Sequence, residues 1–381
     1  MRIELSPEHK LLQENVRRFT DEVVRPRAAE IDQSGEFPRD FYDQAGELGL
    51  AGVAVPEEHG GSGMDQIAYC VVIEEIAKAC ATSAVILSVN NSLVCDPILS
   101  FGNDEQKRDV LTPLASGAKL GAFCLTEPSA GSDAAALKAR AVKDGDTYRL
   151  TGEKVFITNG TDADWLLVFA TVDPDQGHKG ITAFLVPTDA ERVTRGGHEH
   201  KLGVNASGTT WINFDDTPVP ASLRLGQEGE GFKIAMATLD GGRVGIAAQA
   251  VGIAQAAFDE ALAYSQEREQ FRRKLSDMQP IQFYLADMAM ELDAGRLLTW
   301  KAAAAKQAGK RYTLEAAQAK LFTSEMAQRV TNKALQIHGG YGYTREYNVE
   351  RYFRDARITE IYEGTSEIQK MVIADWVVNR A

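Results

Sequence analysis

The spacing of apolar residues changes twice along the chain, and this change limits the possible folds more than any other feature. From Ser6 to about Leu120 the spacing is helical, with glycine-rich turns between the helices. From about Gly121 to Gly229, short β-branched and aromatic runs alternate with turns, as in strands. Helical spacing returns at Gly231. The chain is therefore predicted to be an α+β multidomain protein with an N-terminal helical domain, a middle antiparallel β-barrel or sandwich and a C-terminal four-helix bundle, over residues 1–120, 121–230 and 231–381.

Local patterns place several elements within this outline. Ser6-Pro7-Glu8 predicts a helix start, because a serine caps the helix and proline suits its first position. The expected strands are residues 148–150, 154–158, 165–172, 181–186 and 210–214. Two sets of apolar residues share one helix face each: Val251, Ala254, Phe258 and Leu262, and Ile281, Leu285, Met288 and Leu292. No GxGxxG motif follows a strand, so a Rossmann domain is not expected.

Charge argues against a nucleic acid or an anionic membrane as the main partner. The 381 residues carry a net charge of -13, with both signs interspersed, whereas phosphate binding needs a concentrated positive field. The polar stretch Met1–Lys10 is neither a signal peptide nor an obvious transit peptide. No apolar run is expected to approach the roughly 18 residues that a membrane span requires. We therefore expect a cytoplasmic protein that does not enter a membrane.

Cysteine and histidine patterns give no metal site. Cys70, Cys80, Cys95 and Cys124 form no CxxC pair, and we expect them to be reduced and mostly buried thiols. The close pair in His198-Glu199-His200 lacks an HExxH pattern and is expected to be an exposed loop.

Six segments carry residues suited to ligand binding or acid–base chemistry. Each also has a simpler explanation as a surface loop, a strand end, a surface ion pair, a charged helix end or a glycine C-cap. The segments are Phe123–Asp133 (FCLTEPSAGSD), Phe156–Gly160 (FITNG), Leu239–Gly245 (LDGGRVG), Arg268–Leu275 (REQFRRKL) with Gln279, Gln336–Tyr343 (QIHGGYGY) and Ile361–Gln369 (IYEGTSEIQ).

In this order the six segments resemble those of the acyl-CoA dehydrogenases, flavoenzymes that oxidise acyl thioesters between the α and β carbons. Ser88–Leu93 and the approach Arg354–Glu360 are also similar to that family, most like its short-chain, butyryl-type members. Val85 and Val89 are apolar where enzymes for longer chains often have polar residues. The helix–strand–helix order is that of the same family.

The resemblance implies a role for each matching residue. Glu363 would be the catalytic base. Residues implied to contact FAD are Phe123, Cys124, Leu125, Thr126, Ser132, Phe156, Ile157, Thr158, Arg268, Phe271, Gln279, Gln336, Ile337, His338, Gly339, Gly340, Thr365, Ser366 and Glu367. Arg268 and the segment from Gln336 to Gly340 would reach the FAD of a neighbouring subunit. Residues implied to contact acyl-CoA are Ser132, Asp240, Arg243 and Gly364.

Three positions depart from the common family pattern, and a fourth bears on which residue is the base. Ser129 and Arg272 stand where glycine is usual, and Phe156 stands where tryptophan is commoner. A minority of members, the isovaleryl-type enzymes, carry the base at position 242, where this chain has glycine. Gly242 therefore agrees with Glu363 as the base.

The implied reaction is FAD-dependent α,β-dehydrogenation of a short-chain acyl-CoA to a trans-2-enoyl-CoA. Glu363 would remove the α proton while the hydride passes to flavin N5, and the Glu363 N–H and a flavin ribityl hydroxyl would hold the thioester carbonyl. Burial beside the ligand should raise the pKa of the base towards working pH. The family implies an electron-transfer flavoprotein as acceptor and a homotetramer.

Other functions on the same fold remain open from the sequence. They are a branched short-chain dehydrogenase, a flavin oxidase, a nitroalkane oxidase, a flavin monooxygenase and a non-enzymatic acyl-CoA-binding scaffold. Nitroalkane oxidases use aspartate as base, and a scaffold has no need of Glu363 or Thr126, so both residues favour the dehydrogenase.

Overall fold

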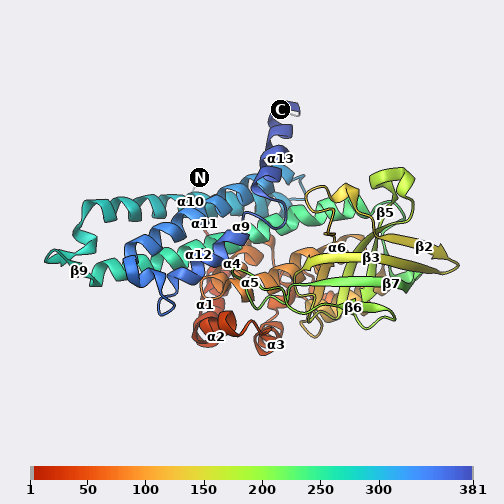
Figure 1. The fold of residues 1–381 in the computed structure, drawn as a ribbon, viewed down its shortest axis with the longest axis horizontal. Coiled ribbons are helices and arrows are strands. Elements are labelled where there is room, and N and C mark those ends of the chain that lie inside the picture. Colours follow the sequence, from red (N-terminus) through yellow and green to blue (C-terminus); the bar gives the residue numbers. More distant parts are fainter. Residues whose placement is uncertain (1–3, 380–381) are drawn as a thin grey trace.

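The computed structural model describes residues 4–379. Figure 1 shows an elongated molecule with the sheet at one end and long helices extending to the other. Helices occupy the chain before Gly121, strands lie between Gly121 and Leu225, and helices return at Gly231, so the predicted helix–strand–helix order is confirmed. Residues 1–3 of the polar N-terminal stretch lie outside the described residues.

The N-terminal helices form a compact layer under the long C-terminal helices. Ser6 caps the first of them as expected, since its side chain accepts from His9 N at 3.2 Å. The elements are α1 (Pro7–Phe19), η1 (Thr20–Val24), η2 (Arg25–Arg27), α2 (Ala28–Ser34), α3 (Arg39–Glu47), η3 (Leu50–Gly52), η4 (Glu57–His59), α4 (Gln66–Ala77), α5 (Ala81–Ser88), η5 (Val89–Cys95), α6 (Asp96–Phe101), α7 (Asp104–Gln106), η6 (Lys107–Leu111) and α8 (Thr112–Ala115).

The middle region is one eight-stranded sheet with the path β6-β7-β3-β2-β4-β5-β8. Most neighbouring strands are antiparallel, as predicted, but β1 and β2 each pair with β4 in parallel. Its elements are β1 (Gly121–Cys124), η7 (Ala134–Ala136), β2 (Arg140–Asp144), β3 (Thr147–Ile157), β4 (Trp165–Thr171), η8 (Pro174–Gly180), β5 (Ile181–Pro187), β6 (Val193–Arg195), β7 (Thr210–Pro220), η9 (Ala221–Leu223) and β8 (Arg224–Leu225).

The C-terminal helices are the longest in the structure. Helix α9 runs through the centre of the molecule, and α13 stands out from its surface (Figure 1). The elements are α9 (Gly231–Glu267), β9 (Glu269–Gln270), β10 (Arg273–Lys274), η10 (Leu275–Asp277), α10 (Gln279–Gln307), α11 (Thr313–His338), η11 (Gly339–Tyr343), α12 (Val349–Ile358) and α13 (Ser366–Asn379).

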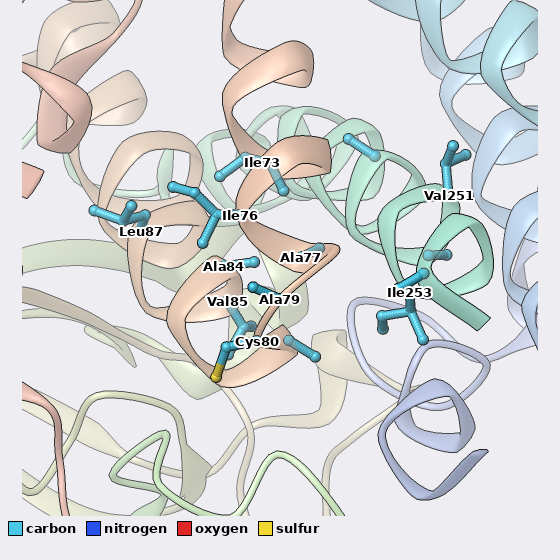
Figure 2. Close-up of a cluster of buried hydrophobic side chains, with 14 of the residues drawn as sticks. Ile73, Ile76, Ala77, Ala79, Cys80, Ala84, Val85, Leu87, Val251 and Ile253 are labelled. Carbon is cyan, nitrogen blue, oxygen red and sulfur yellow. The ribbon is translucent and has the colours of Figure 1, made fainter. Parts of the chain in front are cut away.

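One continuous core joins the N-terminal and C-terminal helices. Figure 2 shows Ile73 and Ile76 of α4 and Val85 of α5 near Val251 and Ile253 of α9, and all five side chains are buried. Burial of each such side chain contributes about 1.5–3 kcal/mol. The core therefore fixes α9 against α4 and α5.

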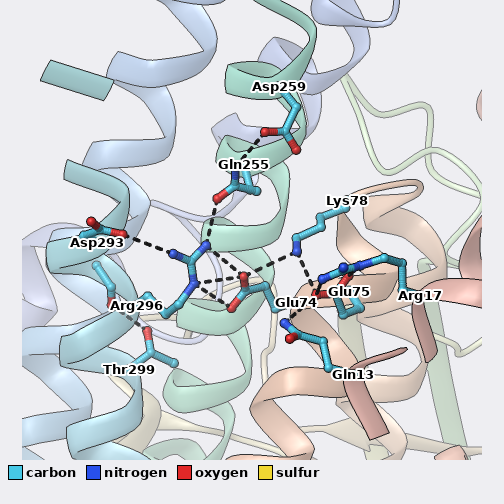
Figure 3. A network of polar contacts seen from close by, with 11 residues as sticks. Gln13, Arg17, Glu74, Glu75, Lys78, Gln255, Asp259, Asp293, Arg296 and Thr299 are labelled. Carbon is cyan, nitrogen blue, oxygen red and sulfur yellow. Dashed lines mark hydrogen bonds and ion pairs between the residues drawn. The ribbon is translucent and has the colours of Figure 1, made fainter. Parts of the chain in front are cut away.

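A buried polar network lies beside this core. Glu74 and Glu75 of α4 are both almost inaccessible to solvent. Arg296 of α10 binds Glu74 through two nitrogens, at 2.9 and 3.0 Å, and Lys78 binds Glu75 at 2.7 Å (Figure 3). Arg17 of α1 binds Glu75 at 3.1 Å. Because each buried carboxylate has cationic partners, the network holds α1, α4 and α10 in register.

The expectation that no apolar run is long enough to span a membrane was wrong. The continuous helical stretch Ala81–Phe101 has 21 residues, and its most apolar window of 18 residues has a mean hydropathy of 1.4. Of its most apolar part, 78% is buried inside the protein. Apolar side chains of this stretch face the protein core on all sides, which explains why a core helix has the composition of a span.

Candidate active site

Glu363 lies in the turn between α12 and α13, and its backbone is strained. Its φ is 51° and that of Gly364 is 92°, so two successive residues have left-handed backbone conformations. For a glutamate this conformation costs about 1–2 kcal/mol. The carboxyl Oε2 is buried and forms no hydrogen bond within the described residues. A buried acceptor left without a donor is costly, and such groups occur where a ligand completes the site.

The surroundings of Glu363 make it a weak acid. Burial raises the pKa of its carboxyl to about 8, although the positive charges of Lys320 and Arg243 oppose this rise. A carboxylate with a pKa near working pH can both accept a proton and release it. The electrostatics therefore suit the role that the sequence predicts for Glu363.

Gly242 of α9 faces the Glu363 carboxyl group. A methyl group on the Gly242 Cα would overlap Glu363 Oε2 and lie 2.7 Å from Leu93 Cδ2. Glycine is therefore required here by close approach. Positions 242 and 363 therefore border the same space.

Asp240 and Arg243 lie on α9 close to Glu363 and bind each other. Arg243 donates to Asp240 Oδ1 at 2.7 Å, and the Thr313 hydroxyl donates to Asp240 Oδ2 at 2.6 Å. Arg243 is 5% exposed and its Nε has no partner within the described residues. The pair is therefore buried, whereas the simpler sequence interpretation was a surface ion pair. One guanidinium nitrogen remains available to a ligand.

The segment from Phe123 to Asp133 is held against β3 by a buried ion pair. Lys154 of β3 is fully buried, and its ammonium donates to Glu127 Oε1 at 2.7 Å and to the Leu125 carbonyl at 3.1 Å. Val155 N donates to the Thr126 carbonyl at 2.9 Å. These contacts place Thr126, at the end of β1, next to the strand that ends in Phe156, Ile157 and Thr158. Cys124, Leu125 and Ile157 are buried, whereas Ser132 is exposed.

The end of β3 presents the aromatic ring of Phe156 at the surface. The pairing of β3 with β7 is irregular between Lys154 and Ile157, and Phe156 has a φ of 58°. The bulge turns the ring outwards, where it is 68% exposed. Thr126 and Thr158 are half-buried, and neither hydroxyl forms a hydrogen bond with the described residues. Strained backbone, an exposed aromatic ring and free hydroxyls fit the ring system of FAD.

The helical segment η5 connects the region around Thr126 and Phe156 to Glu363. Leu93 contacts the space between Gly242 and Glu363, and its neighbour Val94 packs against Gly121 at the start of β1. Asn159 after β3 donates to the carbonyls of Ile86 and Gly121 at 3.2 Å. The first, second, third and last predicted segments therefore converge on one region between the sheet and the helices.

The segments at Arg268 and Gln336 lie elsewhere. The Arg268 guanidinium lies 5.5 Å from the centre of the Tyr341 ring, and Tyr264 stacks on His338 with ring centres 4.2 Å apart. Gly242 and Arg268 are separated by 26 residues of α9, or about 39 Å of helix. Figure 1 shows the β9 hairpin at the end of the molecule opposite the sheet. Arg268, Phe271, Gln279 and the segment Gln336, Ile337, His338, Gly339 and Gly340 therefore form a second group, remote from Glu363 of the same chain.

His338 packs inside the C-terminal helices. It is 4% exposed, its Nδ1 lies 2.8 Å from the Ala334 carbonyl, and burial lowers its pKa. Gly339 follows α11 with a φ of 61° and ends the helix, as expected of a glycine C-cap.

The Arg268 segment forms a β-hairpin whose two-residue turn should affect the stability of the protein. Phe271 and Arg272 have φ of 51° and 64°, as both central residues do in a type I′ turn. Glycine adopts this conformation without strain, so Arg272→Gly should stabilise the protein by about 1 kcal/mol in urea unfolding. Arg273→Gly, in the strand β10, is the matched control and should destabilise it. Lower stability of R272G than of the unchanged protein would contradict the role of the turn.

The remaining predicted residues lie around the start of α13. Thr365 precedes the helix, Ser366 is buried with an unpartnered hydroxyl, and Glu367 is exposed. The Gly364 carbonyl accepts from Gln369 at 2.9 Å and from Lys320 at 2.6 Å. Sequence reasoning missed Lys320, Gln369 and Lys154. For Lys320 the only available signal was a lysine inside an alanine-rich helical stretch, and that pattern also fits an ordinary surface lysine.

The loops and thiols agree with the sequence analysis. All four cysteines are free and buried. The segment His198–His200 belongs to no helix or strand, and both histidines are exposed, as expected of a surface loop.

Comparison with known proteins gives three matching family models. The "Acyl-CoA dehydrogenase" N-terminal, middle and C-terminal domain models match residues 6–118, 122–217 and 229–378. The short-chain specific acyl-CoA dehydrogenase of Clostridium acetobutylicum is 48% identical over 374 residues, covering 98% of this chain and 99% of that protein. The mitochondrial short-chain specific acyl-CoA dehydrogenase of Bos taurus is 50% identical over 372 residues, covering 98% and 90%.

Two solved structures are similar over their full length. Butyryl-CoA dehydrogenase from Megasphaera elsdenii has a TM-score of 0.98 at 46% identity and covers 100% of both chains. A chain in a structure titled for the electron transferring flavoprotein of Acidaminococcus fermentans has a TM-score of 0.98 at 45% identity, again over 100% of both chains.

Proposed function

The chain belongs to the acyl-CoA dehydrogenase family, and we propose that it oxidises short-chain acyl-CoA thioesters with Glu363 as the catalytic base. The single observation that carries the assignment of the base is the buried carboxyl Oε2 without a partner, facing Gly242. Relatives along almost the whole chain are short-chain specific enzymes.

FAD is the cofactor of this family, and the residues near Phe156 fit it. Thr126 and Thr158 would bind the edge of its ring system, Phe156 would cover one face, and Thr365, Ser366 and Glu367 would approach it from the start of α13. When bound, FAD supplies the acceptor for the hydride that leaves the β carbon.

The residues of the chain perform the proton transfer. The thioester carbonyl acidifies the α proton only when donors stabilise the charge that develops on its oxygen. The left-handed conformation at Glu363 frees its backbone N–H for this purpose, because no hydrogen bond of that N–H is formed within the described residues. The ionised carboxyl group then accepts the α proton, and the surrounding side chains exclude water. The product is a trans-2-enoyl-CoA.

The side chains around the Glu363 carboxyl group favour a substrate with a short acyl chain. One helical turn along α9 from Gly242, a methyl group on Gly245 would overlap the Tyr69 hydroxyl, which is hydrogen-bonded to Ser88 at 2.9 Å. Leu93, Val85 and Val89 are buried and apolar. We expect that Tyr69 and Ser88 limit the depth available to the acyl tail, and that Ser132, Asp240, Arg243 and Gly364 contact the thioester and CoA.

A panel of acyl-CoA thioesters with a dye acceptor tests this proposal. We expect kcat/KM to be highest for a four-carbon straight chain and at least about tenfold lower for eight carbons, since a methylene that does not fit a pocket is worth about 1–3 kcal/mol. Highest activity on a branched chain would instead assign the branched-chain alternative. Hydrogen peroxide formed in proportion to substrate would assign an oxidase.

We also propose a homotetramer that passes electrons to an electron-transfer flavoprotein. The second group of FAD residues, around Arg268 and Gln336, can serve a cofactor only if another copy of the chain brings one to it. Phe271 is 89% exposed at the hairpin tip, as expected for a side chain that a neighbour covers. The free thiols support a cytoplasmic location. Light scattering should give four copies; a monomer that retains FAD and activity would contradict this assembly.

A further inference from the structure

Lys320 of α11 is a fully buried lysine outside the motifs that the sequence singled out. Its ammonium donates to the Gly364 carbonyl at 2.6 Å, directly after the base in the chain. Burying an ammonium group costs several kcal/mol, and a packing role could be filled by an apolar side chain. The position of this charge therefore needs a reason beyond packing.

Lys320 and Gln369 together clamp the strained turn at Glu363. Gln369 Nε2 donates to the Gly364 carbonyl at 2.9 Å and to the Glu363 carbonyl at 3.3 Å. Both residues of the turn have left-handed φ, which persists only where the surroundings fix it. Two donors on adjacent carbonyls provide this constraint. They determine the direction in which the Glu363 side chain and N–H point.

The charge of Lys320 is also unmatched by a close anion. Arg243 is paired with Asp240, whereas no carboxylate lies within 4.0 Å of the Lys320 ammonium in residues 4–379. Helix α11 packs against α9, α10, α12 and α13. The charged groups that act on Lys320 are Glu363 in the turn, Arg243 of α9 and Glu367 of α13, and Glu363 has the largest effect among them. Burial lowers the pKa of Lys320, whereas the negative charge of Glu363 raises it. The positive charge of Lys320 in turn lowers the pKa of Glu363, so each group favours the charged form of the other.

We propose that Lys320 is a positioning residue for the base: its ammonium fixes the Glu363–Gly364 turn and acts as the buried counter-charge of the Glu363 carboxylate. This inference rests on the proposed function of Glu363. When Glu363 is ionised the two buried charges balance each other. When it has accepted the α proton, the charge of Lys320 is no longer balanced, which favours release of the proton in the second half of the cycle.

The variant Lys320→Met tests the proposal in the FAD-loaded protein. Removing the positive charge disfavours the ionised carboxyl, so the acid limb of kcat/KM for butyryl-CoA should move to higher pH by at least about one unit. At pH 7 this corresponds to a loss of at least about tenfold in kcat/KM. Lys320→Arg keeps the charge and should restore the position of the limb. Lys78→Met, which removes a lysine from the network around Glu75, is the matched control and should leave the limb unchanged.

An infrared titration without substrate gives a second readout that does not depend on turnover. The protonated carboxyl band that is absent from Glu363→Gln should titrate near pH 8 in the unchanged protein and at higher pH in K320M. A yellow K320M protein with unchanged acid limb and unchanged infrared midpoint would overturn the proposal.

If K320M does not fold, Lys320→Gln is used for the same two measurements. Failure of both neutral variants to fold beside a folded K320R would show that Lys320 serves stability alone, which also overturns it. Absence of butyryl-CoA oxidation by the unchanged protein would refute the proposed function, while the infrared shift would still report on Lys320.

Discussion

Glu363→Gln should reduce turnover of butyryl-CoA by about 10³-fold or more, the range expected when a general base is removed from a proton-abstraction step. The amide is nearly isosteric with the carboxyl group, so the turn, FAD binding and CoA binding should persist. The purified variant should therefore be yellow and should bind butyryl-CoA with little change in affinity. Stopped-flow measurement of flavin bleaching separates this loss from product release. Near-normal turnover of E363Q would remove Glu363 from the mechanism.

The same variant should also change how stability depends on pH. The folded protein holds the Glu363 proton up to a pKa of about 8, whereas the unfolded chain releases it near the ordinary value of 4.5. The folded state therefore binds more protons across this interval, and stability falls as the pH rises from 4.5 to 8. E363Q lacks this contribution, so its thermal midpoint should exceed that of the unchanged protein by an increasing margin as the pH rises to 8. An equal or lower midpoint at pH 8 would contradict the buried, unpartnered state of the carboxyl.

Gly242→Ala should be the second most damaging change, with kcat lowered by about 10²-fold. The added methyl group would overlap Glu363 Oε2 and lie 2.9 Å from the carboxyl carbon of Glu363, so the carboxyl group must move away. Displacement of a reacting group by about 1 Å can cost about 10²-fold in rate. FAD content should remain normal, because Gly242 is not among the residues proposed to bind it. The measurement is kcat with butyryl-CoA alongside the flavin absorbance of the purified protein.

Gly197→Ala is the matched control for this substitution. A methyl group on Gly197 has no neighbouring atom within 4 Å, and its backbone needs no left-handed conformation. We expect full activity from G197A. Full activity from G242A would show that the carboxyl group of Glu363 does not occupy the position beside α9 that the mechanism requires.

The sequence predicted the order of the helices and strands well, because the spacing of apolar residues and the residues that form turns are local properties. It did not reveal that the expected strands 148–150 and 154–158 form one strand, β3, which ends at Ile157, since the glycine between them is typical of a turn. Strand β2 was also missed, because only one of its five residues, Ala141, is buried and the apolar alternation is weak. The parallel pairing of β1 with β4 depends on contacts distant in sequence.

For the site, the resemblance divided the candidate residues between one chain and a neighbouring subunit, but the sequence does not show which of them lie close together in space. Glu363 and Gly242 are far apart in the chain, and only the packing of the turn against α9 brings them together. The separation of Arg268 and Gln336 from Glu363 follows from the length and straight course of α9, which residue patterns do not encode. Lys320 could not be distinguished from a surface lysine, because its burial depends on the position of α13 and the preceding turn.

A crystal structure of the protein with FAD and a non-reactive butyryl-CoA analogue tests the central claim most directly. We predict a Glu363 carboxyl oxygen about 3–3.5 Å from the α carbon, the separation expected of reacting atoms, with the flavin ring on the opposite face of the acyl chain. A Glu363 side chain directed to solvent, away from the acyl carbons, would contradict the account.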